Sequence, residues 1–277
     1  MARARTHGGW RHLPAALIAI GFLLPIVYMV TGSLRAPGTS PPRTAELLPW
    51  PPTTAAYERA FELVDLGRYI VNSVAVAAVT VPLTILVASW AGFAMAMLSP
   101  RAARFLIAVS LVALMVPLTA LLVPRFILFR ELGLIDTYAP VVASSLVATT
   151  PFYVLLYLWG FRRLPADVVD AARLEGLGPL QVWWRVAMPL VRPLTVAVAV
   201  LSFVFSWSNF LDPLVYLVDD ELHTLPLGLR SLASLGQQDY PVFLAGAVAA
   251  TLPVIGAFLY LQRFFLAERA RDLGTSS

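Results

Sequence analysis

The chain has 277 residues, of which 59% are hydrophobic and only 13% are charged, and its mean hydropathy is +0.77. A soluble domain carries about 25% charged residues, so this composition excludes an ordinary water-exposed surface and predicts a protein with several membrane spans. The formal net charge is +4, there is no cysteine, and all 20 basic residues are arginine, which excludes disulfides, thiolate metal sites and a P-loop ATPase, whose lysine contacts the phosphates.

Apolar stretches of about 20 residues, the length that crosses a bilayer, recur along the chain. They predict six membrane helices, at 13–34, 70–98, 103–124, 138–160, 193–215 and 242–265. The first follows a basic start, as a signal peptide would, but its apolar stretch is longer than that of a signal peptide and no clean cleavage pattern follows. We therefore expect it to remain as a membrane helix.

Five of the expected spans contain a proline, which kinks a helix and frees a carbonyl group. The prolines are Pro25, Pro82, Pro117, Pro151 and Pro253. Two interpretations remain open at this point. The kinks serve packing alone, or they let the bundle bend around a pathway.

The distribution of arginine predicts the orientation of the spans. Arginines outnumber acids in both terminal tails and in the links after the second and fourth spans, whereas acids dominate 212–241. Both termini are therefore expected in the cytoplasm, in agreement with an even number of spans. The arginines do not form one basic patch, so nucleic-acid binding is not expected. The spans hold almost no charge, which argues against an ion-coupled carrier.

The link after the fourth span reads as a short helix, a tight turn and a second helix. Pro165 suits the first turn of a helix, and the acids that follow favour the positive end of its dipole. Gly176 is expected to end this helix in a left-handed conformation, and Pro179 to start the next one. From these residues alone, the segment is either a plain amphipathic loop or a helix that enters a cleft of a partner protein.

The same segment carries a specific motif. Residues 170–177 read DAARLEGL and residues 186–189 read VAMP. This pattern resembles the EAA motif of ABC transporter permeases, EAAxxDGA followed after about nine residues by an apolar residue, x, and LP. The two acids are exchanged with charge kept, Leu177 replaces a small residue, and Met188 replaces the leucine.

Other segments are similar to the maltose-type sugar permeases, in the same order along the chain. They read NSVAVAAVTVPLTILVASWAGFAMA (72–96), ELGLIDTYAPVV, PFYVLLYLWGFRRLP, WSNFLDPLVYL (207–217), TLPLGL and LPVIGAFLYLQRFF. The resemblance covers roughly 60–277. Two departures are the serine before Asn209 and a C-terminal tail without the usual ending, which puts a second contact with the ATPase subunits in doubt.

The resemblance implies an all-α membrane protein, a six-helix type I ABC importer transmembrane domain with a cytoplasmic coupling helix. It implies a cytoplasmic N-terminal tail (1–12), a first span with an extracytoplasmic loop (13–60), a permease core (61–266, with the EAA loop at about 164–190) and a cytoplasmic C-terminal tail (267–277). The place implied for it is the bacterial plasma membrane.

The resemblance also implies the partners and the chemistry. They are a second permease subunit in a heterodimer, two ABC ATPase subunits that use ATP and magnesium, and an extracytoplasmic solute-binding protein. This chain would hold no cofactor and would be no enzyme. The residues implied to couple it to the ATPase are Asp170, Ala171, Ala172, Glu175, Gly176 and Pro189.

The fifth span offers candidates for a solute pathway. Sugars favour aromatic faces and amide hydrogen bonds, which points to Trp207, Asn209 and the neighbouring Asp212. The alternative is that the tryptophan anchors the helix at the membrane interface and the asparagine bonds a neighbouring helix. Where an importer has two different permeases, one of them can hold all of the solute contacts.

Two other functions remain open from the sequence. The EAA motif fits a permease for peptides, amino acids or oxyanions equally well, although the segments PFYVLLYLWGFRRLP and WSNFLDPL favour sugars. A membrane scaffold without transport is the other alternative, and it predicts no stable association with an ATPase pair.

Overall fold

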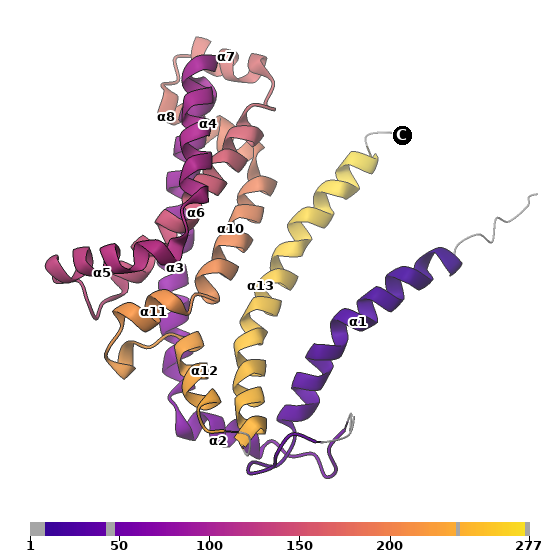
Figure 1. Cartoon of the computed structure of the whole chain (residues 1–277). Helices are drawn as coiled ribbons and strands as arrows, with labels where there is room; N and C mark the ends of the chain where they lie inside the picture. The colour runs from indigo at the N-terminus through magenta and orange to yellow at the C-terminus, as the bar shows by residue number, and fades with distance from the viewer. Residues whose placement is uncertain (1–8, 43–47, 237–238, 275–277) are drawn as a thin grey trace, which may run out of the picture. The chain divides into compact units, whose positions relative to one another are not determined.

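The computed structural model describes residues 9–42, 48–236 and 239–274. In these residues all regular secondary structure is helical, without a strand, which confirms the all-α prediction (Figure 1). The chain divides into two compact units, one of residues 1–67 and 228–252 and the other of 68–227 and 253–277. Of the expected N-terminal tail, residues 1–8 lie outside the described residues, as do 275–277 of the C-terminal tail.

The first unit contains α1 (Gly9–Ser33), α2 (Ala55–Leu63) and the first turns of α13 (Tyr240–Gly274). The Ser33 and Tyr57 hydroxyls are hydrogen-bonded at 2.7 Å and join α1 to α2. Most side chains of α1 are exposed in this chain, with Phe22 at 78%. An apolar helix with this exposure needs lipid or another protein around it.

The second unit is built around α6 (Tyr138–Phe161), which packs against α4, α10 and α11. The remaining elements of this unit are α3 (Leu66–Met97), α4 (Pro100–Met115), η1 (Leu118–Leu121), α5 (Leu122–Glu131), α7 (Ala166–Leu174), α8 (Pro179–Val182), η2 (Trp183–Ala187), α9 (Met188–Leu190), α10 (Arg192–Trp207), α11 (Leu211–Tyr216), η3 (Asp220–Leu222), the start of α12 (Leu225–Ala233) and the part of α13 from residue 253 onward.

Three of the described helices are long and apolar enough to cross a membrane, with spanning segments at 13–33, 66–97 and 240–260. Three bent pairs bring the number to as many as six if each pair forms one span. The bends measure 83° between 100–115 and 118–131, 49° between 138–147 and 150–161, and 85° between 179–190 and 192–207. The predicted positions of the apolar segments are thus recovered as helices, although half of them are bent.

The expected span 103–124 is wrong as one continuous helix, because the chain turns at Val116 and Pro117. Val116 is extended, with φ −73° and ψ 120°, as a residue before proline prefers. The expected span 193–215 is likewise interrupted between Trp207 and Leu211. Pro25, Pro82 and Pro253, in contrast, lie inside continuous helices.

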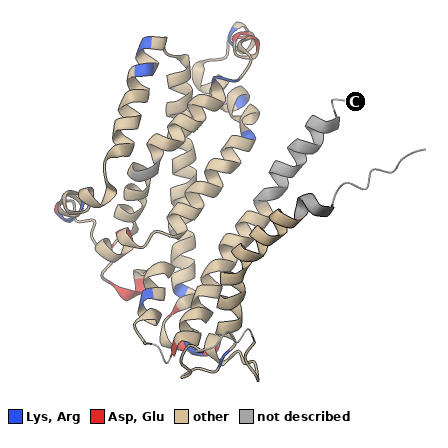
Figure 2. Ribbon diagram, turned by 45° about the vertical axis from the view of Figure 1, so that its right-hand side comes forward, with Lys and Arg blue, Asp and Glu red and all other residues tan. Residues whose placement is uncertain are grey.

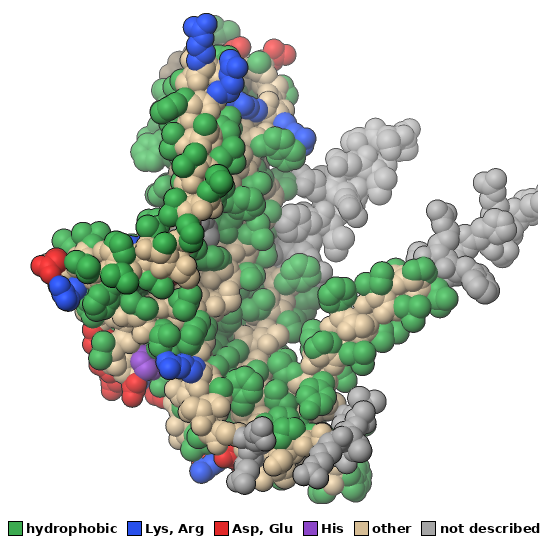
Figure 3. All heavy atoms as spheres, in the orientation of Figure 1, with side chains coloured by type: hydrophobic (Ala, Val, Ile, Leu, Met, Phe, Trp, Pro, Cys, Tyr) green, Lys and Arg blue, Asp and Glu red, His purple; other side chains and the backbone are tan. Residues whose placement is uncertain are grey.

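Charged residues concentrate at helix ends and in loops, while the parts of the long helices that Figure 2 colours are nearly free of them. Hydrophobic side chains cover much of the visible molecular surface (Figure 3). A surface of this kind suits lipid and apolar protein partners rather than water.

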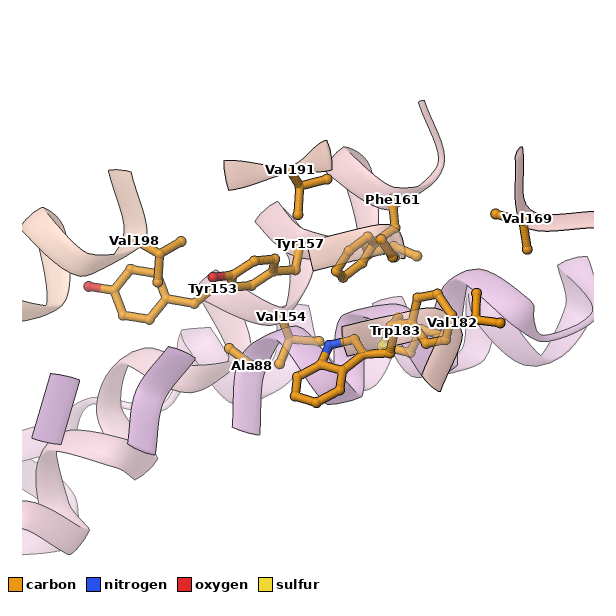
Figure 4. Packing of buried hydrophobic residues seen from close by; sticks show 14 of the residues in the cluster. Ala88, Tyr153, Val154, Tyr157, Phe161, Val169, Val182, Trp183, Val191 and Val198 are labelled. Carbon is orange, nitrogen blue, oxygen red and sulfur yellow. The ribbon is translucent and has the colours of Figure 1, made fainter. Parts of the chain in front are cut away.

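The largest buried cluster holds α6 against α3 and the segment that carries α7. Phe93 and Phe161 pack edge to face with ring centroids 5.4 Å apart, and Tyr157 stacks on Phe161 at 5.7 Å. Trp183 stacks on Trp90 at 6.1 Å. Figure 4 shows Tyr157, Phe161 and Trp183 with valines of the same cluster around them.

Candidate functional site

The first candidate site is α7 and the turn that follows it. Asp167 lies in the first turn of α7 and Arg173 in the last, so each charge stabilises its end of the helix dipole. Pro165 stands at the N-cap, just outside the helix. The alanines at 171 and 172 are the strongest helix formers. The short helix predicted from the sequence is therefore present, with bounds Ala166–Leu174.

Gly176 ends this helix in a Schellman turn. Its φ is +84°, its N–H donates to Arg173 O at 2.9 Å, and the Leu177 N–H donates to Ala172 O at 3.1 Å. A left-handed residue at this position is most easily glycine. The predicted left-handed end of α7 is thus confirmed.

The chain then starts α8 at Pro179, as predicted. The Gly178 N–H donates to Gln181 Oε1 at 3.1 Å, which satisfies one of the free donors at the start of this helix. A turn of π-helix at Trp183–Ala187 and the three-residue α9 follow, and the exposed Pro189 lies in α9.

One face of α7 is anchored in the buried cluster. Val169 and Ala172 are 8% and 7% exposed and pack in the cluster of Figure 4 with Val182 and Trp183, while Leu177 packs against it partly buried. Ala172, expected to contact a partner, is thus turned into the protein. The segment is not a loose loop, because Leu164 before α7 and Leu177 after it both pack against the buried cluster.

The opposite face of α7 is presented outward. Leu174 is 90% exposed and Val168 39%. Four residues of α7 and its turn that were predicted to couple the chain to the ATPase are also exposed: Asp170, Ala171, Glu175 and Gly176. An apolar strip flanked by acids is a surface that fits a groove with apolar walls and basic edges.

Arg173 connects α7 to the end of α3. Its Nη2 donates to the thioether sulfur of Met97 at 3.0 Å, and its Nη1 lies 3.6 Å from Asp170 Oδ1. Met97 is the last residue of α3. A second link to α3 runs through η2, where Trp183 stacks on Trp90.

The second candidate site is a cavity of about 300 Å³ where two helix breaks face each other. Its polar lining includes Arg125 of α5 with Asn209 and Asp212 around the break before α11. The full lining is Leu118, Thr119, Leu122, Arg125, Phe205, Ser208, Asn209, Phe210, Leu211 and Asp212.

These polar side chains form one connected group. Arg125 Nη2 lies 3.7 Å from Asp212 Oδ1, and Asn209 Nδ2 donates to Asp212 Oδ2 at 2.8 Å. The Asp212 N–H donates in turn to Asn209 Oδ1 at 3.3 Å. The arginine and aspartate side chains are only 13% and 12% exposed. An ion pair with so little exposed surface in a membrane protein is a candidate functional site.

Two of the three pathway residues predicted from the sequence thus line the cavity, and the third does not. Trp207 is 5% exposed and stacks on Phe203 with ring centroids 5.4 Å apart. Arg125 was missed, because it follows the expected span 103–124 directly and reads as an ordinary end-of-span charge. Only the bend at Pro117 brings it to Asp212, and no local pattern predicts that pair.

Comparison with known proteins identifies the family of this chain. A family model described as "Binding-protein-dependent transport system inner membrane component" matches residues 80–269. The arabinooligosaccharides transport system permease protein AraQ of Halalkalibacterium halodurans is 32% identical, with 91% of each chain covered. The lactose transport system permease protein LacG of Rhizobium radiobacter is 29% identical over 91% of this chain and 90% of its own.

Solved structures share the fold. A chain from the crystal structure of a bacterial ABC transporter involved in the import of the acidic polysaccharide alginate matches with a TM-score of 0.77 and 22% identity, covering 96% of this chain and 99% of that one. A methionine ABC transporter in an inward-facing conformation matches with a TM-score of 0.58 and 17% identity, over 73% and 95% of the two chains. These structures show that the chain has the fold of an ABC importer permease. The matched family and the apolar helices make it a multi-pass membrane protein. The chain belongs to the family of binding-protein-dependent transport system inner membrane components.

Proposed function

We propose that this chain is a permease subunit of an ATP-driven importer that moves a sugar, delivered by a solute-binding protein, across the bacterial plasma membrane. The observation that carries the proposal is the exposed face of α7 on a buried anchor, which fits docking to a motor subunit. The names of the relatives support the solute class, since AraQ and LacG are called permeases for arabinooligosaccharides and lactose.

The partners follow from this function. They are a second permease subunit, two ABC ATPase subunits and an extracytoplasmic binding protein. ATP and magnesium would be bound by the ATPase subunits, and this chain would contribute no chemical step. The family description, which names dependence on a binding protein, supports this assembly.

α7 would seat in a cleft of one ATPase subunit. Leu174 and Val168 would fill apolar space there, and Asp170 and Glu175 would face basic side chains. Ala172 and Pro189 would hold the segment in shape, while Ala171 and Gly176 would let the partner approach closely. Because α7 packs against α8 and η2, and Trp183 of η2 stacks on Trp90 of α3, closure of the ATPases would shift these helices together.

The orientation follows from the same assembly. With six spans, counting each bent pair once, α7 and both termini would lie in the cytoplasm. The cavity around Arg125 and Asp212 would lie toward the outer side of the membrane. The excess of arginine over acid in the tails and around α7 supports this orientation. Asn209 and Asp212 would border the solute pathway, and Trp207 would support them from behind.

Gly176→Asp tests the docking of α7, because a side chain there would meet nothing within 4 Å in this chain and so would project from the surface. We expect loss of ATP-driven sugar uptake, with the variant still inserted in the membrane. The matched control is Gly133→Asp, since Gly133 has a φ of +68°, ends α5 in the same kind of turn and also has open space around it. Normal uptake and ATPase assembly in the Gly176→Asp variant would sink the docking proposal.

A further inference from the structure

The geometry points to the cavity around Arg125, Asn209 and Asp212 as a binding site for a neutral, hydroxyl-rich saccharide unit that excludes acidic sugars. This inference rests on the proposed function and narrows its substrate class. It is carried by the charge balance of the cavity, which neither the fold nor the EAA motif determines.

The cavity has the size and the walls of a small-ligand site. Its volume of about 300 Å³ is at the lower end of the usual range for such sites, which is roughly 300–1,000 Å³. Two aromatic rings, Phe205 and Phe210, and the leucines of η1 and α5 supply the apolar walls. The apolar C–H faces of a sugar ring pack against surfaces of this kind, while its hydroxyl groups need polar partners.

Donors and acceptors in the cavity are held in place before any ligand arrives. The Nε and Nη2 groups of Arg125 donate to the carbonyls of Leu121 and Leu118, both at 3.3 Å, so the guanidinium is fixed by the carbonyls near the bend. Asn209 Nδ2 reaches Asp212 Oδ2 at 2.8 Å and Ser145 Oγ at 3.4 Å, which orients the carboxylate. Groups fixed in this way bind without losing much conformational entropy.

A free donor and a free acceptor remain for the ligand. Among the described residues, the contacts of Arg125 involve Nε and Nη2 and leave Nη1 for a ligand oxygen. The Asp212 carboxylate has further lone pairs and accepts from a hydroxyl group. A hydroxyl group both donates and accepts, so neighbouring hydroxyls of one sugar ring suit this pair of groups.

The charges select a neutral ring. Asp212 lies 3.7 Å from the Arg125 guanidinium and balances it, so the cavity has no net positive charge to attract a carboxylate. A uronic acid placed here would put a second negative charge beside Asp212, and at low exposure such repulsion is weakly screened. Discrimination by repulsion is a common way to reject a close analogue.

The absence of cysteine from the chain allows a direct test. Thr119→Cys places one thiol on the cavity wall, and its modification by a small water-soluble methanethiosulfonate is followed in the assembled transporter in lipid nanodiscs. Lactose and arabinotriose are the neutral probes, and digalacturonate is the acidic one. At a saccharide concentration twice its dissociation constant, the modification rate falls about threefold if the sugar fills the cavity.

We expect at least one neutral saccharide to protect the thiol and digalacturonate not to protect it. The Asp212→Asn variant leaves Arg125 without its counter-charge. In this variant digalacturonate should protect the thiol, and the neutral sugar should no longer protect it better than digalacturonate does. Asp212→Glu keeps the charge and should keep the neutral preference. Ser234→Cys, on an exposed residue outside the cavity, controls for effects on the reagent and should show no protection.

Absence of protection by both neutral saccharides overturns the site, and equal protection by neutral and acidic saccharides overturns the charge selection. Failure of the proposed function has a different signature, because it would appear as normal uptake in the Gly176→Asp variant. The protection assay needs no ATP, so its result does not depend on the docking of α7.

Discussion

Gly92 of α3 lies against Tyr157 of α6 with no space for a side chain between them. A methyl group on Gly92 would come within 2.7 Å of Tyr157 Cβ and within 2.9 Å of two backbone atoms of α6, Leu158 N and Val154 O. Backbone atoms cannot rotate away as a side chain can. Small residues let membrane helices approach in this way. This crossing fixes α3 next to the helix around which the second unit is built.

We predict that Gly92→Ala destabilises the protein, although alanine favours a helix over glycine by about 1 kcal/mol. Overpacking of a close contact costs about 1–3 kcal/mol, and here part of that cost falls on the backbone of α6. The measurement is the thermal melting temperature of the purified protein. Gly256→Ala is the control, since Gly256 of α13 has nothing within 4 Å, and that variant should melt no lower than the wild type. Equal melting of the two variants would contradict the prediction.

Much of the helical layout is predictable from the sequence because each apolar segment is a local feature. The long helices α1, α3 and α13 begin and end within a few residues of the expected spans, apart from the C-terminal end of α13, which continues to Gly274. The 83° bend before η1 is not predictable in size. A proline locates a kink, but neighbouring helices decide whether the helix bends slightly or turns, and that depends on contacts distant in sequence.

The two candidate sites also differ in how far their geometry depends on neighbouring residues or on distant ones. The end of α7 at Gly176 was predicted because a Schellman turn depends on residues within five positions of one another. The direction of Ala172 was not, because which face of α7 is buried depends on Trp183 and on α3. The pair of Arg125 and Asp212 joins segments far apart in the chain, and a single sequence holds no local signal for it.

We predict that Leu174→Ala weakens association with the ATPase subunits and leaves stability unchanged. Leu174 is 90% exposed, so its truncation removes no internal packing, whereas truncation of an interface anchor costs about 2 kcal/mol or more of binding. The measurements are recovery of the ATPase subunits with the tagged permease, and the melting temperature. Leu132→Ala is the control, because Leu132 is 59% exposed and directly follows the last residue of α5, close to the position that Leu174 has at the end of α7. A lower melting temperature with full ATPase recovery would show that Leu174 is structural.

Asp136 holds the loop after α5 to the segment that follows α11. Its Oδ1 accepts hydrogen bonds from the N–H groups of Val218 and Asp219, both at 2.9 Å. Its own N–H donates to Tyr216 O at 2.8 Å, and its φ is +65°. Aspartate and asparagine tolerate this left-handed conformation better than alanine. The side chain and the backbone conformation at this position therefore serve the same connection.

The hydrogen bond from Asp219 N–H, followed by that from Val218 N–H, lowers the pKa of Asp136 below its usual value of 3.8. A carboxyl group whose pKa is lower in the folded state stabilises that state above its unfolded pKa, and this stabilisation is lost as the pH falls through the folded pKa. We predict that Asp136→Ala lowers the melting temperature at pH 7, and that the difference from the wild type shrinks only below pH 3.8. Asp136→Asn keeps an acceptor and the left-handed backbone but no charge, so its melting temperature at pH 7 should lie between the two, and its difference from Asp136→Ala should not change with pH. A difference between the wild type and Asp136→Ala that stays constant down to strong acid would mean that the backbone conformation, and not the carboxylate, makes this contact stable.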